Sequence, residues 1–154
     1  MKRISILLAG ALVTATSGAA IASAHGTAPT AHASAAAKVE LSHTRIGSIL
    51  TSSSGLTLYL FTHDHGSENS CLKVHDCPKF WPAYETSGTP VAGPGVKSSL
   101  LSTIRIAGGA KQVTYAGHPL YTFSEDKPGE TGYVGANSFG GVWEALSASG
   151  HPVK

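Results

Sequence analysis

The chain of 154 residues has 11 Lys and Arg against 9 Asp and Glu, a formal net charge of +2. Two of the basic residues, Lys2 and Arg3, lie in a segment expected to be removed, and without them the charges balance. This balance excludes the positive surface through which proteins bind nucleic acid or anionic membranes. No nucleic-acid partner is therefore expected.

Residues 1–24 have the pattern of a secretory signal peptide. The apolar run Ile4–Val13 is too short to span a bilayer, and Ala22–Ala24 supplies the small residues for cleavage before His25. A membrane anchor is the alternative, but no long apolar segment follows, so the mature chain is expected to have no transmembrane segment. No cysteine near the cut is available to accept a lipid. We therefore expect a secreted, extracytoplasmic protein.

Residues 25–38 are rich in Ala, Thr, Ser and His and lack apolar periodicity, which predicts a flexible lead. A short helix at residues 31–37 is the alternative, although such a helix is marginal on its own in water. Residues 39–154 remain for folding, which is enough for one domain with one hydrophobic core.

A tandem duplication organises the folding part of the chain. The stretch Gly55–Asp64 recurs 62 positions later as Gly117–Asp126. Laying residues 55–91 on residues 117–153 without a gap gives 12 identities in 37 positions. Average composition alone would give roughly two or three. Neither copy has many large apolar residues, so we expect the two repeats to share one core.

The first repeat, about residues 39–91, begins with a loosely alternating run at Val39–Leu50 and a strand at Leu56–Phe61. A Ser- and Gly-rich turn separates these runs, which predicts a hairpin. Residues 62–79 contain both cysteines and most of the local charge, and they are predicted to form a loop. For residues 80–84, an edge strand and a single helical turn both remain open because of the prolines.

The second repeat, about residues 96–153, has runs at Ser102–Ile106 and Lys111–Tyr115 that predict a hairpin about a Gly-Gly turn. The second copy of the motif strand follows. A long Gly-rich loop is expected at residues 125–141, and a strand at Val142–Leu146.

The predicted fold is mainly β, a single compact domain of two pseudo-symmetric antiparallel β repeats with few short helical turns. The motif strands carry apolar residues on both faces, which indicates strands covered on both sides. No segment has ten or more residues with convincing helical periodicity. We expect a monomer.

Both copies of the motif fit the pattern Tyr-x-[Phe/Trp/Tyr]-x-x-Asp. The matching residues are Tyr59, Phe61 and Asp64 in the first copy and Tyr121, Phe123 and Asp126 in the second. Around them lie a cysteine pair before Trp81–Pro82, the segment Val113–Tyr121, and the segment Phe139–Trp143. In these features residues 45–147 resemble a family of predicted bacterial lipoproteins, also described as a secreted repeat of unknown function.

The resemblance implies an extracytoplasmic bacterial envelope protein that is non-catalytic or uncharacterised. It supplies no substrate and no cofactor. This chain departs from the lipoprotein members because it lacks the cysteine that would accept a lipid, so we do not expect it to be tethered to a membrane.

Cys71 and Cys77 are the only cysteines of the chain. An isolated pair in an exported protein most simply forms a disulfide. Closing so small a loop stabilises a fold by about 2 kcal/mol in the chain-entropy model. A redox pair and a metal site are the alternatives, but the spacing is not the Cys-x-x-Cys of thioredoxin-like sites.

A metal site near the first motif is the sharpest chemical alternative. His63, His65 and His75 lie among several carboxylates, and neutral imidazoles suit Zn²⁺ or Cu²⁺. The second repeat, however, has Glu125 and Lys127 where the first has His63 and His65. A site that belongs to the fold should occur in both copies, so we assign no metal or other cofactor.

Asp64 and Asp126 raise the question of paired carboxylates in acid–base catalysis. We favour a structural interpretation. An Asp that ends a strand before a loop can accept hydrogen bonds from backbone amides two residues further on, as in an Asx turn.

The duplicated aromatic residues could form a ligand platform, but aromatic residues at strand spacing more often build a core. A core position is predicted for Tyr59, Phe61, Trp81, Tyr121, Phe123 and Trp143.

The sequence contains no nucleophile elbow, phosphate loop or metalloprotease motif. We therefore expect a non-enzyme, a binding or structural module of the cell envelope or medium with an unknown extracellular partner. A metal-binding or redox-accessory protein is one alternative. A secreted hydrolase is another, and it would require a deep pocket with converging polar groups and a titratable residue of perturbed pKa.

Overall fold

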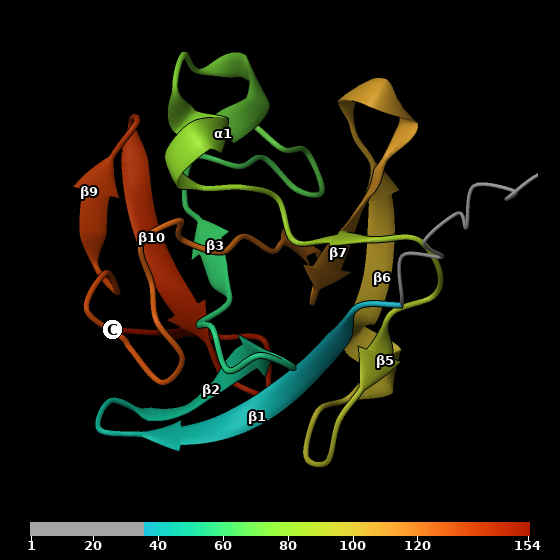
Figure 1. Cartoon of the computed structure of the whole chain (residues 1–154), viewed down its shortest axis with the longest axis vertical. Coiled ribbons are helices and arrows are strands. Elements are labelled where there is room, and N and C mark those ends of the chain that lie inside the picture. The colour runs from blue at the N-terminus through green and yellow to red at the C-terminus, as the bar shows by residue number, and fades with distance from the viewer. Residues whose placement is uncertain (1–35) are drawn as a thin grey trace, which may run out of the picture. The chain divides into compact units, whose positions relative to one another are not determined.

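The alternating segments from residue 38 onward fold into strands joined by short turns (Figure 1). The computed structural model describes residues 36–154, so the predicted signal peptide and nearly all of the predicted lead lie outside the described residues. The first half contains β1 (Lys38–Thr44), β2 (Gly47–Ser52), β3 (Tyr59–Phe61), a 3₁₀ turn (Cys71–Lys73), α1 (Cys77–Phe80), β4 (Glu85–Thr86) and β5 (Val91–Ala92). The second half contains 3₁₀ turns (Ser98–Leu100 and Ala107–Gly109), β6 (Leu101–Arg105), β7 (Lys111–Tyr115), β8 (His118–Pro119), β9 (Ala136–Ser138), β10 (Gly141–Leu146) and β11 (Pro152–Val153). The prediction of a mainly β domain is confirmed.

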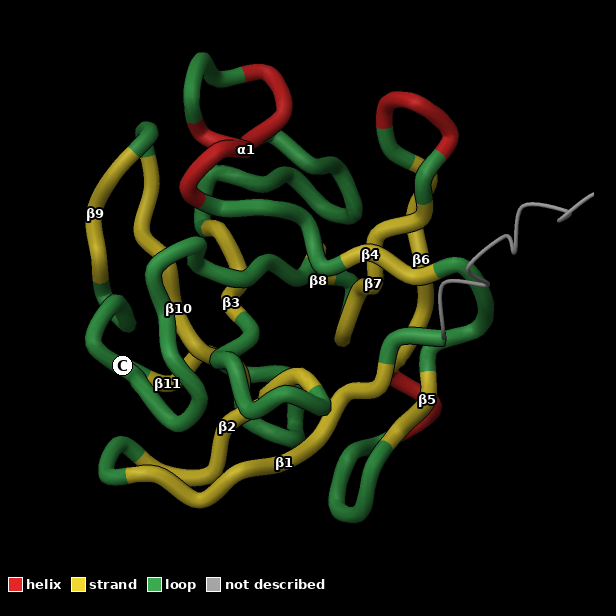
Figure 2. Tube along the Cα trace, viewed as in Figure 1, coloured by secondary structure: helices red, strands yellow, loops and turns green. Residues whose placement is uncertain are grey.

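The strands of the described residues form three sheets (Figure 2). In the first, β1 lies between β2, which is antiparallel to it, and β5, which is parallel. In the second, β10 is central and pairs with β3, β9 and β11. In the third, β7 pairs with β4, β6 and β8.

The first hairpin differs from its prediction. The run Val39–Leu50 is not one strand but most of two, β1 and β2, because the chain reverses at Arg45–Ile46. The reversal ends on Gly47 at φ 118°, a conformation that glycine adopts without steric cost. The expected Ser-Gly turn also exists. It follows β2, and beyond it the Leu58 amide donates to the Leu50 carbonyl at 3.0 Å.

The second hairpin, β6 and β7, and the strand β10 lie where they were predicted. The predicted loop at 125–141 is wrong in part, because β9 lies within it and pairs with β10. The single helical turn, α1, ends on Phe80, and the chain then runs to an isolated bridge at Ala83. Short strands of this kind are easily missed, because three residues carry too little alternation to recognise.

Each motif strand pairs with the tryptophan strand of the other repeat. Tyr59 of β3 lies opposite Ala145 of β10. In the other copy, Tyr121 is bridged to Ala83, which stands 62 positions before Ala145. The two motif strands also meet, because Tyr59 and Tyr121 exchange both of their backbone hydrogen bonds at 2.9 Å. The repeats are thus joined by exchanged strands about a local pseudo-twofold axis.

The interior has an aliphatic and an aromatic part. The aliphatic part is formed chiefly by Val39, Leu50, Leu58, Leu60, Val113, Leu120 and Leu146. The aromatic part is formed by Tyr59, Phe61, Trp81, Tyr121, Phe123 and Trp143, with both cysteines beside them. All six aromatic residues are at most 8% exposed. Among the described residues, no helix has the length and apolar character needed to cross a membrane.

Candidate functional site

The motif tyrosines and aspartates bind each other reciprocally across the two repeats. The Tyr59 hydroxyl donates to Asp126 Oδ2 at 2.7 Å, and the Tyr121 hydroxyl donates to Asp64 Oδ2 at 2.9 Å. A backbone turn positions each carboxylate. The aspartate amide donates to the carbonyl of the motif phenylalanine three positions earlier, and this turn directs the carboxylate back toward the partner strand. The residues of the pattern therefore form one structural unit.

The two carboxylates are not equivalent. Asp64 Oδ1 accepts a second hydrogen bond from the Ser70 amide at 2.7 Å. Asp126 Oδ1 is buried and is the one such side-chain polar atom of the described residues without a partner. The expected Asx turn is therefore a wrong description of both aspartates. Their main partner is a tyrosine of the other repeat, and the second bond of Asp64 comes from six residues further along the chain.

Burial controls how these groups titrate. It raises the pKa of both Asp64 and Asp126, and the hydrogen bonds that each carboxylate accepts only partly oppose this effect. Burial also raises the pKa of Tyr59 and Tyr121, and the neighbouring carboxylate adds to the rise in each case. Both phenols therefore stay protonated at neutral pH and act as donors.

The two repeat tryptophans form the centre of the aromatic core. Trp81 and Trp143 stack with ring centroids 4.0 Å apart and an interplanar angle of 1°. Tyr59 meets Trp81 edge-on at 5.1 Å, and Tyr121 meets Trp143 in the same way at 5.2 Å. Such pairs add about 0.5–1.5 kcal/mol beyond the area they bury. The motif aromatics are therefore core residues and do not form an exposed platform.

Cys71 and Cys77 form the predicted disulfide. It joins the 3₁₀ turn to α1, and both cysteines are at most 1% exposed. A buried disulfide is shielded from external thiols, which favours a structural bond over a redox pair. The bond also agrees with an extracytoplasmic location.

The three candidate histidines do not gather with other ligands. His63 and His65 have ring centroids 5.9 Å apart. His75 is exposed, with its Nδ1 3.1 Å from Asp76 Oδ2. Within residues 36–154, no group of three or more His, Cys, Asp or Glu side chains is placed to hold a metal ion.

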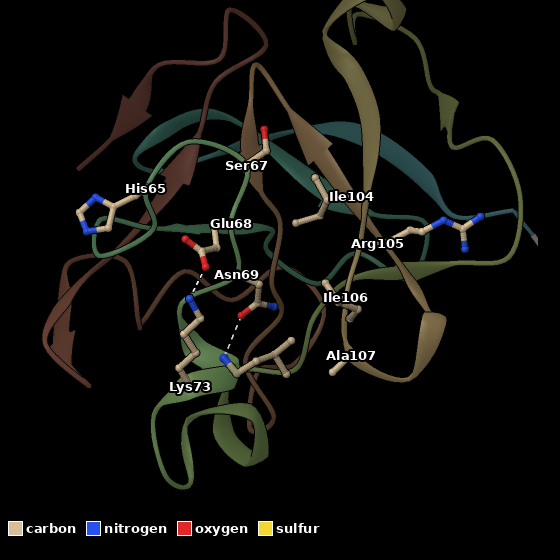
Figure 3. Close-up of a pocket in the computed structure, with 10 residues that line it drawn as sticks. His65, Ser67, Glu68, Asn69, Lys73, Ile104, Arg105, Ile106 and Ala107 are labelled. Atoms are coloured by element: carbon tan, nitrogen blue, oxygen red, sulfur yellow. Dashed lines mark hydrogen bonds and ion pairs between the residues drawn. The ribbon is translucent and has the colours of Figure 1, made fainter.

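A cavity of about 590 Å³ lies between the loop before α1 and the strand β6 (Figure 3). Polar side chains at one of its walls are paired within the protein: Glu68 forms an ion pair with Lys73, and Asn69 Oδ1 accepts the Leu72 amide at 2.9 Å. Figure 3 shows His65 and Arg105 on opposite sides, each directed outward. These side chains do not converge on a common point.

A second cavity, of about 310 Å³, opens beside the aromatic core between α1 and the β9–β10 turn. Its walls include Phe80, Tyr133 and Phe139, which are only half-buried. The motif pattern gave no reason to single these residues out. One feature of the sequence could have drawn attention to Phe139. It precedes Gly140 in a two-residue hairpin turn, where Asn-Gly is the common pair.

Comparison with known proteins supports the suspected family. Residues 102–147 match a family described as a secreted repeat of unknown function. The match runs from β6 through β10 and thus covers the second copy of the motif. Neither curated proteins nor solved structures gave a match.

Proposed function

We propose that this protein, whose second repeat matches a secreted repeat family, is a non-catalytic extracytoplasmic module that binds a ligand or partner outside the cell. The observation that carries the proposal is the reciprocal pairing of the motif. Both tyrosines donate to the aspartate of the opposite repeat, at 2.7 and 2.9 Å. Groups that are hydrogen-bonded to each other in this way stabilise a scaffold, which supports a structural role for the motif.

The cavities favour the same proposal over a secreted hydrolase. A hydrolase needs a nucleophile or an acid–base pair at a point where polar groups converge. The cavity of Figure 3 has its charged pair, Glu68 and Lys73, already joined. The cavity beside α1 is lined almost wholly by aromatic carbon, with Ser138 as its one hydroxyl besides that of Tyr133.

Turnover assays test the proposal directly. The mature chain is incubated with chromogenic ester, peptide, glycoside and phosphate substrates, alongside Asp64→Asn and Asp126→Asn variants whose melting is measured separately. We expect rates equal to the buffer blank for all three proteins. Turnover by the wild type that disappears in a variant with an unchanged melting temperature would overturn the proposal.

The metal-accessory alternative rests on the His63–His65 pair alone. Two imidazoles without a third ligand bind Zn²⁺ or Cu²⁺ weakly. Calorimetry with both metals on the wild type and on a His63→Ala/His65→Ala variant separates the two functions. We expect that the wild type shows no saturable metal-binding heat that is lost in the His63→Ala/His65→Ala variant.

A further inference from the structure

The cavity beside α1 is lined by rings from both repeats. Its floor consists of Trp81 and Phe123, which are 2% and 8% exposed. Its walls are Phe80 and Phe139, with centroids 6.1 Å apart and an interplanar angle of 28°, and Tyr133, whose ring centroid lies 3.9 Å from that of Phe123. At about 310 Å³ the cavity has the size of a small ligand site.

The first repeat has a disulfide where the second repeat has this cavity. The repeat offset of 62 positions places Tyr133 at the position of Cys71 and Phe139 at the position of Cys77. The local backbone agrees, because Val74 donates to the Cys71 carbonyl and Ala136 donates to the Tyr133 carbonyl. In one repeat a covalent bond joins the two positions. In the other repeat they carry two separate rings beside the cavity.

Phe139 adopts a backbone conformation that its side chain disfavours. Its φ is 56°, in the left-handed region that bulky residues rarely enter, and Gly140 follows at φ 91°. A two-residue hairpin turn of this kind favours Asn-Gly or Gly-Gly, so the turn alone does not call for phenylalanine. Such strain is destabilising and clusters at functional sites. What the phenylalanine adds is its ring at the cavity wall.

The charges beside the cavity are mainly negative at its tyrosine wall. The Tyr133 hydroxyl lies 3.5 Å from Glu125 Oε2. Partial desolvation, and then the charges of Glu125, Asp126 and Glu130, raise the pKa of Tyr133. At the opposite wall, the ammonium of Lys79 lies 5.5 Å from the Phe80 ring centroid, so the negative charge that favours a cationic ligand is confined to the tyrosine wall.

We propose that this cavity, whose aromatic walls are Phe80, Tyr133 and Phe139, is a binding site for an alkylated ammonium group. The aromatic faces attract the cation through their quadrupoles, and the carboxylates near Tyr133 add long-range attraction. The inference rests on the proposed binding function and names the ligand class for it.

The lining favours this ligand over a sugar. A sugar needs fixed donors and acceptors for its hydroxyl groups. The one hydroxyl on the wall besides that of Tyr133 belongs to Ser138, and its oxygen already accepts the Trp143 indole N–H at 3.1 Å. A quaternary ammonium such as that of choline has no hydrogen-bond donor at its charged centre and needs only rings and negative charge.

The probe is choline, compared with its neutral carbon isostere, in which a tert-butyl group replaces trimethylammonium. Both are titrated into the mature chain by calorimetry and followed by tryptophan fluorescence. We expect choline to bind saturably and about tenfold tighter than the isostere, which corresponds to the strength of desolvated cation–π contacts. Equal binding of the isostere would overturn the cation proposal in favour of an apolar ligand. Absence of saturable choline binding would overturn it as well.

Phe139→Asn separates binding from folding. Asparagine tolerates the left-handed conformation that phenylalanine disfavours, so we expect an unchanged or higher melting temperature together with loss of choline binding. Glu125→Gln should weaken choline and leave the isostere unchanged. Leu72→Ala, at an exposed residue of the other cavity, is the matched control and should change neither.

The outcomes also distinguish this inference from the proposed function. If choline does not bind and no enzymatic turnover is found, the ligand class is wrong but the proposal of a non-catalytic module still holds. If the Phe139→Asn variant still binds choline, the ligand binds to another surface, and the assignment of this cavity as the binding site is wrong.

Discussion

At the scale of single residues, the two halves of the motif differ in one hydrogen bond. Asp64 accepts from Tyr121 and from the Ser70 amide, whereas Asp126 accepts from Tyr59 alone. A buried acceptor without a donor bears the full cost of losing water. Because of this asymmetry, the two tyrosine hydroxyls contribute unequally to the free energy of unfolding, although both occupy the same position of the motif.

We expect Tyr59→Phe to destabilise the fold more than Tyr121→Phe does. Without the Tyr59 hydroxyl neither oxygen of Asp126 has a protein donor, and the free energy of unfolding should fall by about 1–3 kcal/mol. Urea unfolding measures both values. Tyr133→Phe, which removes an exposed hydroxyl, serves as the control and should change stability by less than about 0.5 kcal/mol. A larger loss in Tyr121→Phe would contradict the assignment.

The same tyrosines predict alkaline instability. Their folded pKa values are raised above the ordinary value of 10.0 by burial and then by the neighbouring carboxylate. The unfolded chain therefore loses these protons first, so stability is complete below pH 10 and declines above it. The decline should approach about 1.4 kcal/mol per pH unit for each tyrosine.

Urea unfolding at a series of pH values measures this slope, and tyrosinate absorbance reports the ionisation itself. A Tyr59→Phe/Tyr121→Phe double variant should lose most of the slope. An identical slope in the double variant would show that other groups cause the alkaline transition.

At the scale of elements, β10 passes β3 too closely for a side chain at Gly141. A Cβ built on Gly141 would lie 2.8 Å from the edge of the Phe61 ring and 3.0 Å from the His63 amide nitrogen. Phe61 cannot move aside easily, because it stacks on Trp143 with centroids 4.0 Å apart. Glycine is needed here for close approach of two strands, not for an unusual φ.

Gly141→Ala should therefore destabilise the protein by about 1–3 kcal/mol, the cost of overpacking a core. Gly132→Ala is the matched control, because its added Cβ meets nothing within 4 Å and its φ is not in the left-handed region. Thermal unfolding followed by circular dichroism gives both values. Equal melting temperatures for the two variants would mean that β10 shifts to accommodate the methyl group.

At the scale of the whole described molecule, strand exchange makes each repeat dependent on the other. β3 pairs with β10 of the second repeat, and Tyr121 is bridged to Ala83 of the first. Either repeat alone would leave a motif strand without its neighbour and one face of the tryptophan stack open to water. Folding should therefore be cooperative across both repeats.

A chain divided between residues 94 and 95 tests this dependence. We expect each fragment to lack a cooperative melting transition and the near-ultraviolet circular dichroism of the stacked tryptophans, and the mixture to regain both. The cut falls before Gly95, in the connection between β5 and β6. A sharp melting transition in either fragment alone would contradict the exchanged architecture.

The duplication, the mainly β fold and the disulfide could be predicted from the sequence. Each depends on local or periodic features: identities at a constant offset, alternation within short strands, and one cysteine pair in a chain predicted to be exported. The burial of the duplicated aromatics could also be predicted, because Tyr59 and Tyr121 sit at strand spacing among other apolar residues.

Which strand pairs with which, and therefore which groups meet, could be read only from the folded structure. The Tyr59–Asp126 bond joins residues 67 positions apart, and no local pattern distinguishes it from pairing within one repeat. The cavity at Phe139 also depends on the contact of Phe80 in α1 with Phe139 in the β9–β10 turn, which is set by packing across the repeats. Propensity acts over neighbouring residues, whereas the choice of partner depends on the free energy of the complete core.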